Sequence, residues 1–123
     1  MRKRVSGGGR LRKIEAQLQR VLAELIAREV KDPRVGNLTV TGVSLSADMG
    51  VARVYFTPFV SSHPADEVQS GLIRAAGFLR GEAGRRLGLR HAPRLDFVLD
   101  DTAEKAARLT GLIDRAVSGK AND

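Results

Sequence analysis

Six arginines lie close together between Gly71 and Arg94, and their side chains are suited to binding phosphate. The six are Arg74, Arg80, Arg85, Arg86, Arg90 and Arg94, and Glu82 is the one acidic residue in that segment. A guanidinium carries N–H donors in a planar fork that matches two phosphate oxygens, and such contacts position a protein on nucleic acid without reading its sequence. RNA is therefore the first candidate partner, although a basic helix face is by itself more often simply solvated.

A glycine motif lies inside the same segment. Gly81 and Gly84 enclose Glu82 and Ala83, a spacing that occurs in loops that clamp a nucleic-acid backbone. Among 13 glycines in 123 residues such a match is expected by chance, and Glu82 would repel the phosphates that the loop has to hold. We therefore interpret these residues as part of a helix and not as a phosphate clamp.

Metal and catalytic sites are poorly supported. His63 and His91 are far apart in the sequence, and the chain has no cysteine that could join them as a ligand. Asp96, Asp100 and Asp101 gather near the end of a predicted strand, but no nucleophile or apolar pocket accompanies them. We expect no metal site, no catalytic residues and no enzymatic activity.

Tyr55 and Arg53 alternate with buried residues on a predicted strand, so both are expected on its outer face. A tyrosine there could stack on an RNA base. Sheet surfaces that bind RNA in this way need several aromatic residues, and this chain has only one Tyr and four Phe. Solvated strand residues are the simpler interpretation.

The composition favours one soluble domain that binds polyanions. The chain has 123 residues, of which 42% are hydrophobic, and a formal net charge of +7 at pH 7. This surplus attracts nucleic acid by counterion release, and no Trp- or Phe-rich amphipathic face indicates a membrane partner. The absence of cysteine is compatible with the cytoplasm. We expect a cytoplasmic monomer without a cofactor or small-molecule substrate; a nucleoid-type DNA-binding structural protein is the alternative that the same charge permits.

Hydrophobic periodicity predicts a mixed α+β domain. Apolar residues at three- and four-residue steps predict a helix over about residues 10–30, which Pro33 ends. A β-hairpin follows, with a β-bulge at Gly42 where the inward-facing residues change phase. A helical region then begins near Pro64, and a third strand includes residues 95–99. The final predicted helix carries the apolar residues Ala106, Leu109, Ile113 and Val117.

The two ends of the chain are expected to lie outside the domain. Residues 1–9 are basic and rich in glycine, which indicates a flexible N-terminal arm and not a signal peptide. Residues 10–117 form the domain, and residues 118–123 are a short C-terminal tail.

The region around Gly77 permits two interpretations. Its apolar periodicity continues through the glycine, so periodicity alone predicts one long helix that tolerates Gly77 at a cost of about 1 kcal/mol. A bend that needs a conformation disfavoured by a β-carbon would instead make the glycine necessary. Replacement of Gly77 by Ala is stabilising in the first case and destabilising in the second.

Four separated blocks of sequence form a distinctive set: REVKDPRVG at 28–36, VTGVSLS at 40–46, AAGFLR at 75–80, and Leu89 and Arg90 followed by Pro93 and Leu95. Together they closely resemble the ribosome-binding factor A family of bacteria. The resemblance extends over roughly residues 10–113. Four blocks in the same order are far more specific than any one of them.

This resemblance implies a type II KH-like domain in the order α-β-β-α-α-β with a C-terminal helix, whose three-stranded sheet packs on the helices. In the family, an Ala-x-Gly kink between the paired helices replaces the usual GxxG loop, and it corresponds to Ala75 and Gly77. The implied partner is the free immature 30S ribosomal subunit with its 16S rRNA. The implied role is to assist late 16S rRNA processing and maturation, including growth in the cold, with the six arginines as the RNA-binding residues.

Overall fold

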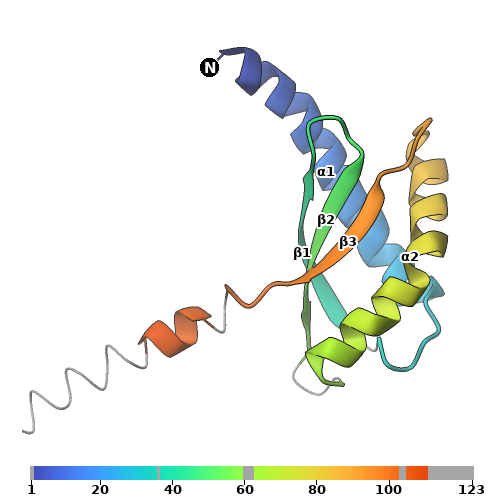
Figure 1. Cartoon of the computed structure of the whole chain (residues 1–123), viewed down its shortest axis with the longest axis vertical. Helices are drawn as coiled ribbons and strands as arrows, with labels where there is room; N and C mark the ends of the chain where they lie inside the picture. Colours follow the sequence, from blue (N-terminus) through green and yellow to red (C-terminus); the bar gives the residue numbers. More distant parts are fainter. Residues whose placement is uncertain (1, 36, 60–62, 103–104, 111–123) are drawn as a thin grey trace, which may run out of the picture.

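The protein folds around one sheet. The computed structural model describes residues 2–35, 37–59, 63–102 and 105–110, with side chains from residue 9 onward. Its elements are α1 (Arg2–Glu29), β1 (Leu38–Leu45), β2 (Val51–Pro58), α2 (Ala65–Leu87) and β3 (Arg94–Leu99). The strands are ordered β1-β2-β3, and the two helices pack against one face of the sheet (Figure 1). The predicted α+β class is confirmed.

The strands pair in two ways, and the predicted bulge is present. β1 and β2 form an antiparallel hairpin, whereas β3 lies parallel to β2. The pairing of β1 shifts between Val40 and Gly42. The additional residue reverses the alternation of side chains, so Val40 and Leu45 are both buried although five positions separate them.

The core lies between the sheet and the two helices. The inward-facing residues of β2 are fully buried. The predicted apolar stripes of α1 and α2 are buried over most of their length, whereas Leu11, Ile14, Val21 and Leu87 are half-buried. The largest fully buried side chains include Leu18, Leu22, Leu25, Val54, Phe56, Val68, Leu72 and Leu79. α1 lies mainly over β1 and α2 mainly over β3, and the two helices also contact each other, so each buries its stripe against its own side of the sheet.

α2 is one continuous helix of 23 residues, where two helices joined by a kink were expected. Gly77 lies within it and keeps a helical backbone; in the described part of the chain, positive φ occurs at Met49 and Gly88. The structure thus has one helix in place of the two that were expected to meet at a kink at Ala75 and Gly77. Figure 1 shows instead that α2 changes direction about midway along its length. That Ala75 and Gly77 cause this bend stays a prediction.

The end of α2 is where a glycine is required. Gly88 adopts the left-handed conformation with φ 64° and ψ 33°. Its amide donates to the Arg85 carbonyl at 3.2 Å, and the Leu89 amide donates to the Gly84 carbonyl at 2.8 Å. These bonds close the last turn of the helix and direct the chain toward β3.

The two ends of the chain differ from expectation in part. α1 begins at Arg2 and not near residue 10, so the segment expected to be a flexible arm continues the helix. Whether residues 1–9 are mobile in solution stays a prediction. At the other end Thr102 and residues 105–110 are helical and exposed, and this stretch extends away from the sheet (Figure 1). The predicted tail 118–123 and the domain boundary at 117 lie outside the described residues.

Side chains from the helices bond to backbone groups of the two outer strands. Two of these side chains come from α1 and reach β1, and one comes from α2 and reaches β3. The bonds are Leu45 N to Glu15 Oε2 (2.8 Å), Gln19 Nε2 to Val40 O (3.0 Å) and Gln69 Nε2 to Phe97 O (2.7 Å). They fasten each helix to the outer strand nearest to it.

Candidate nucleic-acid interface

The six predicted arginines lie on α2, on the connection after it and at the start of β3. Arg74, Arg80, Arg85 and Arg86 belong to α2, Arg90 to the connection, and Arg94 to β3. All six are exposed. The arginines do not form one row. Arg74 and Arg86 contact α1 or the connection after it, whereas Arg80 and Arg94 contact residues in or next to β3.

Arg74 is fastened to the connection between α1 and β1. Its Nη2 lies 2.9 Å from Asp32 Oδ2. The amide of Arg34 donates to the other oxygen, Asp32 Oδ1, at 2.9 Å, and the Arg34 Nε lies 3.4 Å from that Oδ1. The hydrogen bond from the Arg34 amide and that from Arg74 lower the pKa of Asp32 from 3.8 to about 2. Asp32 is therefore ionised at neutral pH and compensates both arginines.

Two arginines near the end of α2 also have acidic partners. Arg86 Nη1 lies 3.3 Å from Glu24 Oε1 of α1, and the same carboxylate oxygen is 3.9 Å from Arg28. Arg85 pairs with Glu82 one turn earlier in α2. In each contact a carboxylate compensates part of the arginine's positive charge. An approaching phosphate therefore meets less net positive charge at these two arginines.

Arg80 and Arg94 lie toward β3. Arg80 donates from Nε and Nη2 to the Ala92 carbonyl oxygen, at 3.0 and 2.9 Å, and so holds the connection before β3. A carbonyl does not cancel the charge of a guanidinium, so Arg80 remains a cation at this edge. Arg94 Nε lies 3.4 Å from Asp96 Oδ1, and the Arg94 side chain is 68% exposed.

Arg90 differs from the other five. It is exposed in the connection after α2 and forms no ion pair or side-chain hydrogen bond with the residues that the structure describes. Its full charge and all of its donors are available to a ligand. Of the predicted residues, Arg90 is the one that a phosphate could bind without displacing an existing partner.

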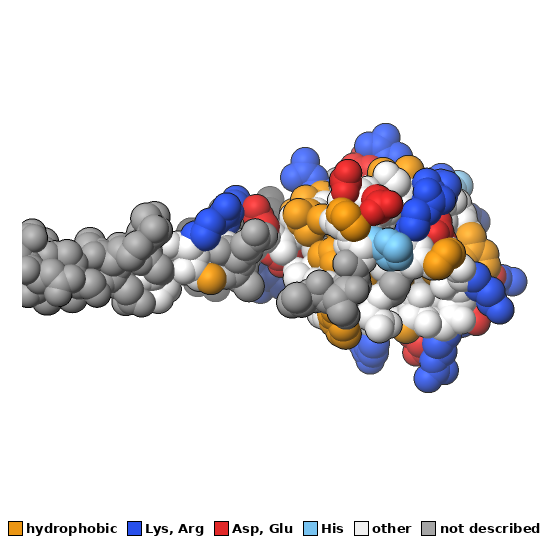
Figure 2. All heavy atoms as spheres, turned by 90° about the horizontal axis from the view of Figure 1, so that it is seen from below, with side chains coloured by type: hydrophobic (Ala, Val, Ile, Leu, Met, Phe, Trp, Pro, Cys, Tyr) orange, Lys and Arg blue, Asp and Glu red, His pale blue; other side chains and the backbone are white. Residues whose placement is uncertain are grey.

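The charges are distributed around the molecule. Figure 2 shows Lys and Arg side chains around the rim of the view, with Asp and Glu side chains between them. The six predicted arginines therefore do not form one uninterrupted cationic surface, because acidic side chains that are distant in sequence contact two of them. Asp32 is 42 residues before Arg74, and Glu24 is 62 residues before Arg86. Sequence reasoning missed both partners, since no local spacing connects them.

The glycines and histidines that the sequence singled out form no further site in the part of the chain that the structure describes. The GxxG motif lies within the last turns of α2 and not in a loop, and Gly84 is buried. Ala75 is half-buried and Gly77 exposed, both on α2. His63 and His91 are exposed, and no three acidic or histidine side chains among the described residues are grouped to hold a metal ion.

Neither α1 nor α2, nor the short described stretch at 105–110, is long and apolar enough to cross a lipid bilayer. The long helix α1 is amphipathic, with its apolar stripe turned to the core. This agrees with the packing of both helices on the sheet.

Comparisons with known proteins agree on one family. The family model described as ribosome-binding factor A matches residues 10–113. The ribosome-binding factor A of Thioalkalivibrio sulfidiphilus is 52% identical over 109 residues, which are 89% of this chain and 84% of that protein. The crystal structure of ribosome-binding factor A from Thermus thermophilus matches with a TM-score of 0.66 and 38% identity, over 72% of this chain and 94% of that one.

A second solved structure concerns a complex. It is a homology model of the Thermus thermophilus factor fitted into a cryo-EM map of a 30S complex, with a TM-score of 0.62 and 38% identity. It covers 72% of this chain and 93% of that one. The family model alone matches well over half of the sequence. The chain belongs to the ribosome-binding factor A family.

Proposed function

We propose that this protein is a non-enzymatic, cytoplasmic assembly factor that binds the free immature 30S subunit. There it assists late processing and maturation of 16S rRNA, including during growth in the cold. The observation that carries the proposal is membership in a family one of whose members has been fitted into a map of a 30S complex. The protein acts as a monomer.

The arginines support binding by charge and shape. Arg90 offers an uncompensated guanidinium, and Arg80 keeps its charge while it holds the connection before β3. The paired arginines remain usable because exposed ion pairs contribute only about 0–1 kcal/mol each, so rRNA phosphates can replace the acids. Contacts of this kind recognise a folded RNA surface and not a base sequence.

The proposal is tested by co-sedimentation of the purified protein with ribosomal particles. We expect binding to free 30S subunits at concentrations where 70S ribosomes and plain duplex DNA bind much more weakly. Equal binding to duplex DNA would favour the nucleoid-type alternative, for which the geometry offers no specific support. Absence of binding to 30S subunits would refute the proposed function.

Two single variants test the assigned surface. Arg90→Ala should weaken 30S binding and lower the slope of log affinity against log salt by about 0.7–0.9, the value for one lost phosphate contact. Arg85→Ala, in the last turn of α2, is the matched control, because it removes a nearby arginine that Glu82 already compensates. Its effect on affinity and slope should be smaller. An Arg90→Ala protein with unchanged salt dependence would show that this part of the surface does not contact rRNA.

A further inference from the structure

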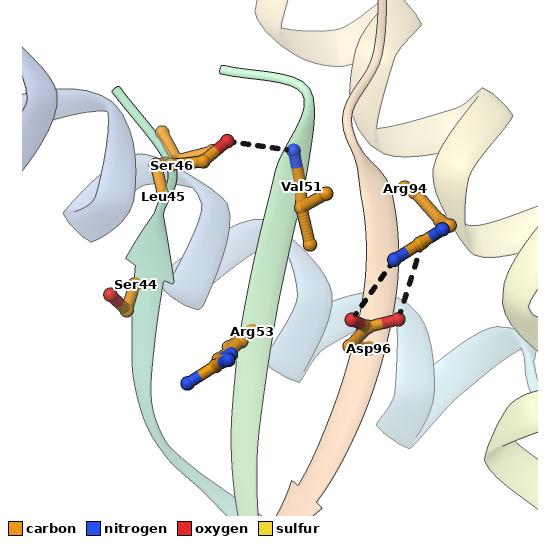
Figure 3. A pocket seen from close by; sticks show the side chains of 7 residues that line it. All are labelled: Ser44, Leu45, Ser46, Val51, Arg53, Arg94 and Asp96. Atoms are coloured by element: carbon orange, nitrogen blue, oxygen red, sulfur yellow. Dashed lines mark hydrogen bonds and ion pairs between the residues drawn. The ribbon is translucent and has the colours of Figure 1, made fainter. Parts of the chain in front are cut away.

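The face of the sheet opposite the helices has a shallow depression of about 390 Å³ near the β1–β2 turn. Residues from all three strands line it, including Ser44, Ser46, Val51, Arg53, Arg94 and Asp96 (Figure 3). The strand register explains why they meet. Ser44 is paired with Arg53, Arg53 with Asp96, and Val51 with Arg94. These polar side chains therefore stand next to one another on the open face.

The two arginines of the depression are in different states. Asp96 faces Arg94, with 3.4 Å between Oδ1 and Nε (Figure 3). Arg53 is directed toward β1 and away from Asp96, and it forms no ion pair with the described residues (Figure 3). With one acid for two arginines, the depression keeps a net positive charge.

Hydroxyl groups add to this polarity in unequal ways. Ser46 Oγ donates to Asp48 at 2.7 Å and accepts from the amides of Gly50 and Val51, so it is fully occupied in the turn. Ser44 Oγ is exposed and has no hydrogen-bond partner among the described residues. Arg53 and Ser44 thus present free donors side by side.

We propose that this depression is a second RNA-contact site, which binds one phosphate of the RNA backbone through Arg53 and Ser44, with Arg94 exchanging Asp96 for the same phosphate. Residues diagonal to each other on neighbouring strands have Cα atoms about 7–8 Å apart, so two long arginine side chains can converge on one phosphate. The inference rests on the ribosomal function proposed above and adds a contact on the face of the sheet opposite α2.

The chemistry of the depression fits RNA phosphate. A guanidinium binds two oxygens of a phosphate at once, and a serine hydroxyl can donate to a third. Five of the seven lining residues have a polar or charged side chain, which favours an ionic ligand over an apolar one. Release of Asp96 from Arg94 requires only the loss of an exposed pair, which is weak.

The test combines 30S co-sedimentation with variants of opposite expected sign. Arg53→Ala should weaken 30S binding about five- to eightfold at 0.1 M monovalent salt, the value for one lost phosphate contact. Asp96→Asn should strengthen it, because Arg94 is then free. Arg20→Ala is the matched control: it removes an exposed arginine of α1 that has no ion-pair partner among the described residues and lies on the other side of the sheet. Equal affinities of the Arg53→Ala and Arg20→Ala proteins, or weaker binding by Asp96→Asn, would overturn the proposal while the ribosomal function stands.

A second measurement identifies the ligand chemistry. In an NMR titration of the full chain with a short single-stranded RNA, the amide signals of Ser44, Arg53 and Asp96 should shift, and Arg53→Ala should abolish these shifts. If Arg53→Ala weakens 30S binding but RNA leaves the three signals unmoved, the depression contacts an acidic protein surface and the RNA proposal is refuted. A chain that binds no 30S subunits at all would remove the ribosomal function and this inference with it.

Discussion

The two sides of α2 use the same residue type for opposite reasons. On the packed side a β-carbon added at Gly71 would lie 2.7 Å from Val35 Cγ2, and one added at Gly84 would lie 2.9 Å from Ala92 Cβ. On the solvent side, Gly77 and Gly81 have nothing within 4 Å of such an atom. Glycine is thus required sterically on one side, whereas on the other it only lowers helix stability. A glycine-rich helix is therefore not a uniformly loose one.

The largest effect is expected from Gly71→Ala. Val35 is buried and stiff, so the new methyl group must displace the connection that Asp32 and Arg74 fasten to α2. Overpacking typically costs about 1–3 kcal/mol, and an approach as short as 2.7 Å belongs to the upper part of that range, about 2–3 kcal/mol. Better helix propensity returns about 1 kcal/mol, so we expect a net loss of about 1–2 kcal/mol. A urea titration measures it. A variant as stable as the unaltered chain would show that the packed side tolerates a side chain and would remove the contrast.

Gly77→Ala should have the opposite sign. Gly77 has a helical backbone and open space around it, so alanine should stabilise the domain by roughly 0.5–1 kcal/mol. Gly81→Ala is the control on the same side and should stabilise by a similar amount. If Gly77 serves the bend in α2, only the Gly77 variant should also lose affinity for 30S subunits. Destabilisation by Gly77→Ala would mean that the glycine is needed structurally after all.

The smallest effect is expected on the stability of the fold at low pH, and it comes from Asp32, the acid that pairs with Arg74 on the packed side of α2. Its pKa is lowered to about 2, so its contribution to stability is complete above about pH 4 and is lost as the pH falls toward 2. Asp32→Asn should therefore flatten the fall in stability between about pH 4 and 2. Asp100, whose pKa hydrogen bonds from Thr102 and Thr41 also lower to about 2, should keep part of the slope.

Urea titrations at several pH values test this, with Asp66→Asn as a control on an exposed carboxylate at the start of α2. The control should retain the slope of the unaltered chain. The same slope in the Asp32 variant would show that the Arg74–Asp32 contact contributes nothing to holding the connection against α2.

Local patterns predicted much of the fold. The bulge at Gly42 followed from a change of phase in the inward-facing residues, and the stripe through Val68, Leu72 and Leu79 followed from helical spacing; both are confirmed. These features depend on neighbours within one turn or one strand, which the sequence displays directly. The apolar periodicity of α2 also predicted one continuous helix. The order of two helices joined by a kink came from the resemblance to the family and not from the periodicity.

The candidate site was less predictable because its charges depend on distant partners. Composition identified the arginines, but only the fold shows that Glu24 contacts Arg86 and that Arg90 has no partner among the described residues. Arg53 was interpreted as a solvated strand residue, since nothing local indicates that the parallel strand β3 brings Arg94 and Asp96 beside it. That pairing joins strands that are separated in the chain by the whole of α2.

The hydrogen bonds from helix side chains to the backbone of β1 and β3 bear on whether a partner can add a strand to the sheet. An unpaired strand edge invites a further strand from another chain, which leads to aggregation or to recognition by strand addition. Here Glu15, Gln19 and Gln69 already occupy backbone groups on both edges. An incoming strand would have to displace them at these positions, so we expect strand addition to be disfavoured at both edges of the sheet.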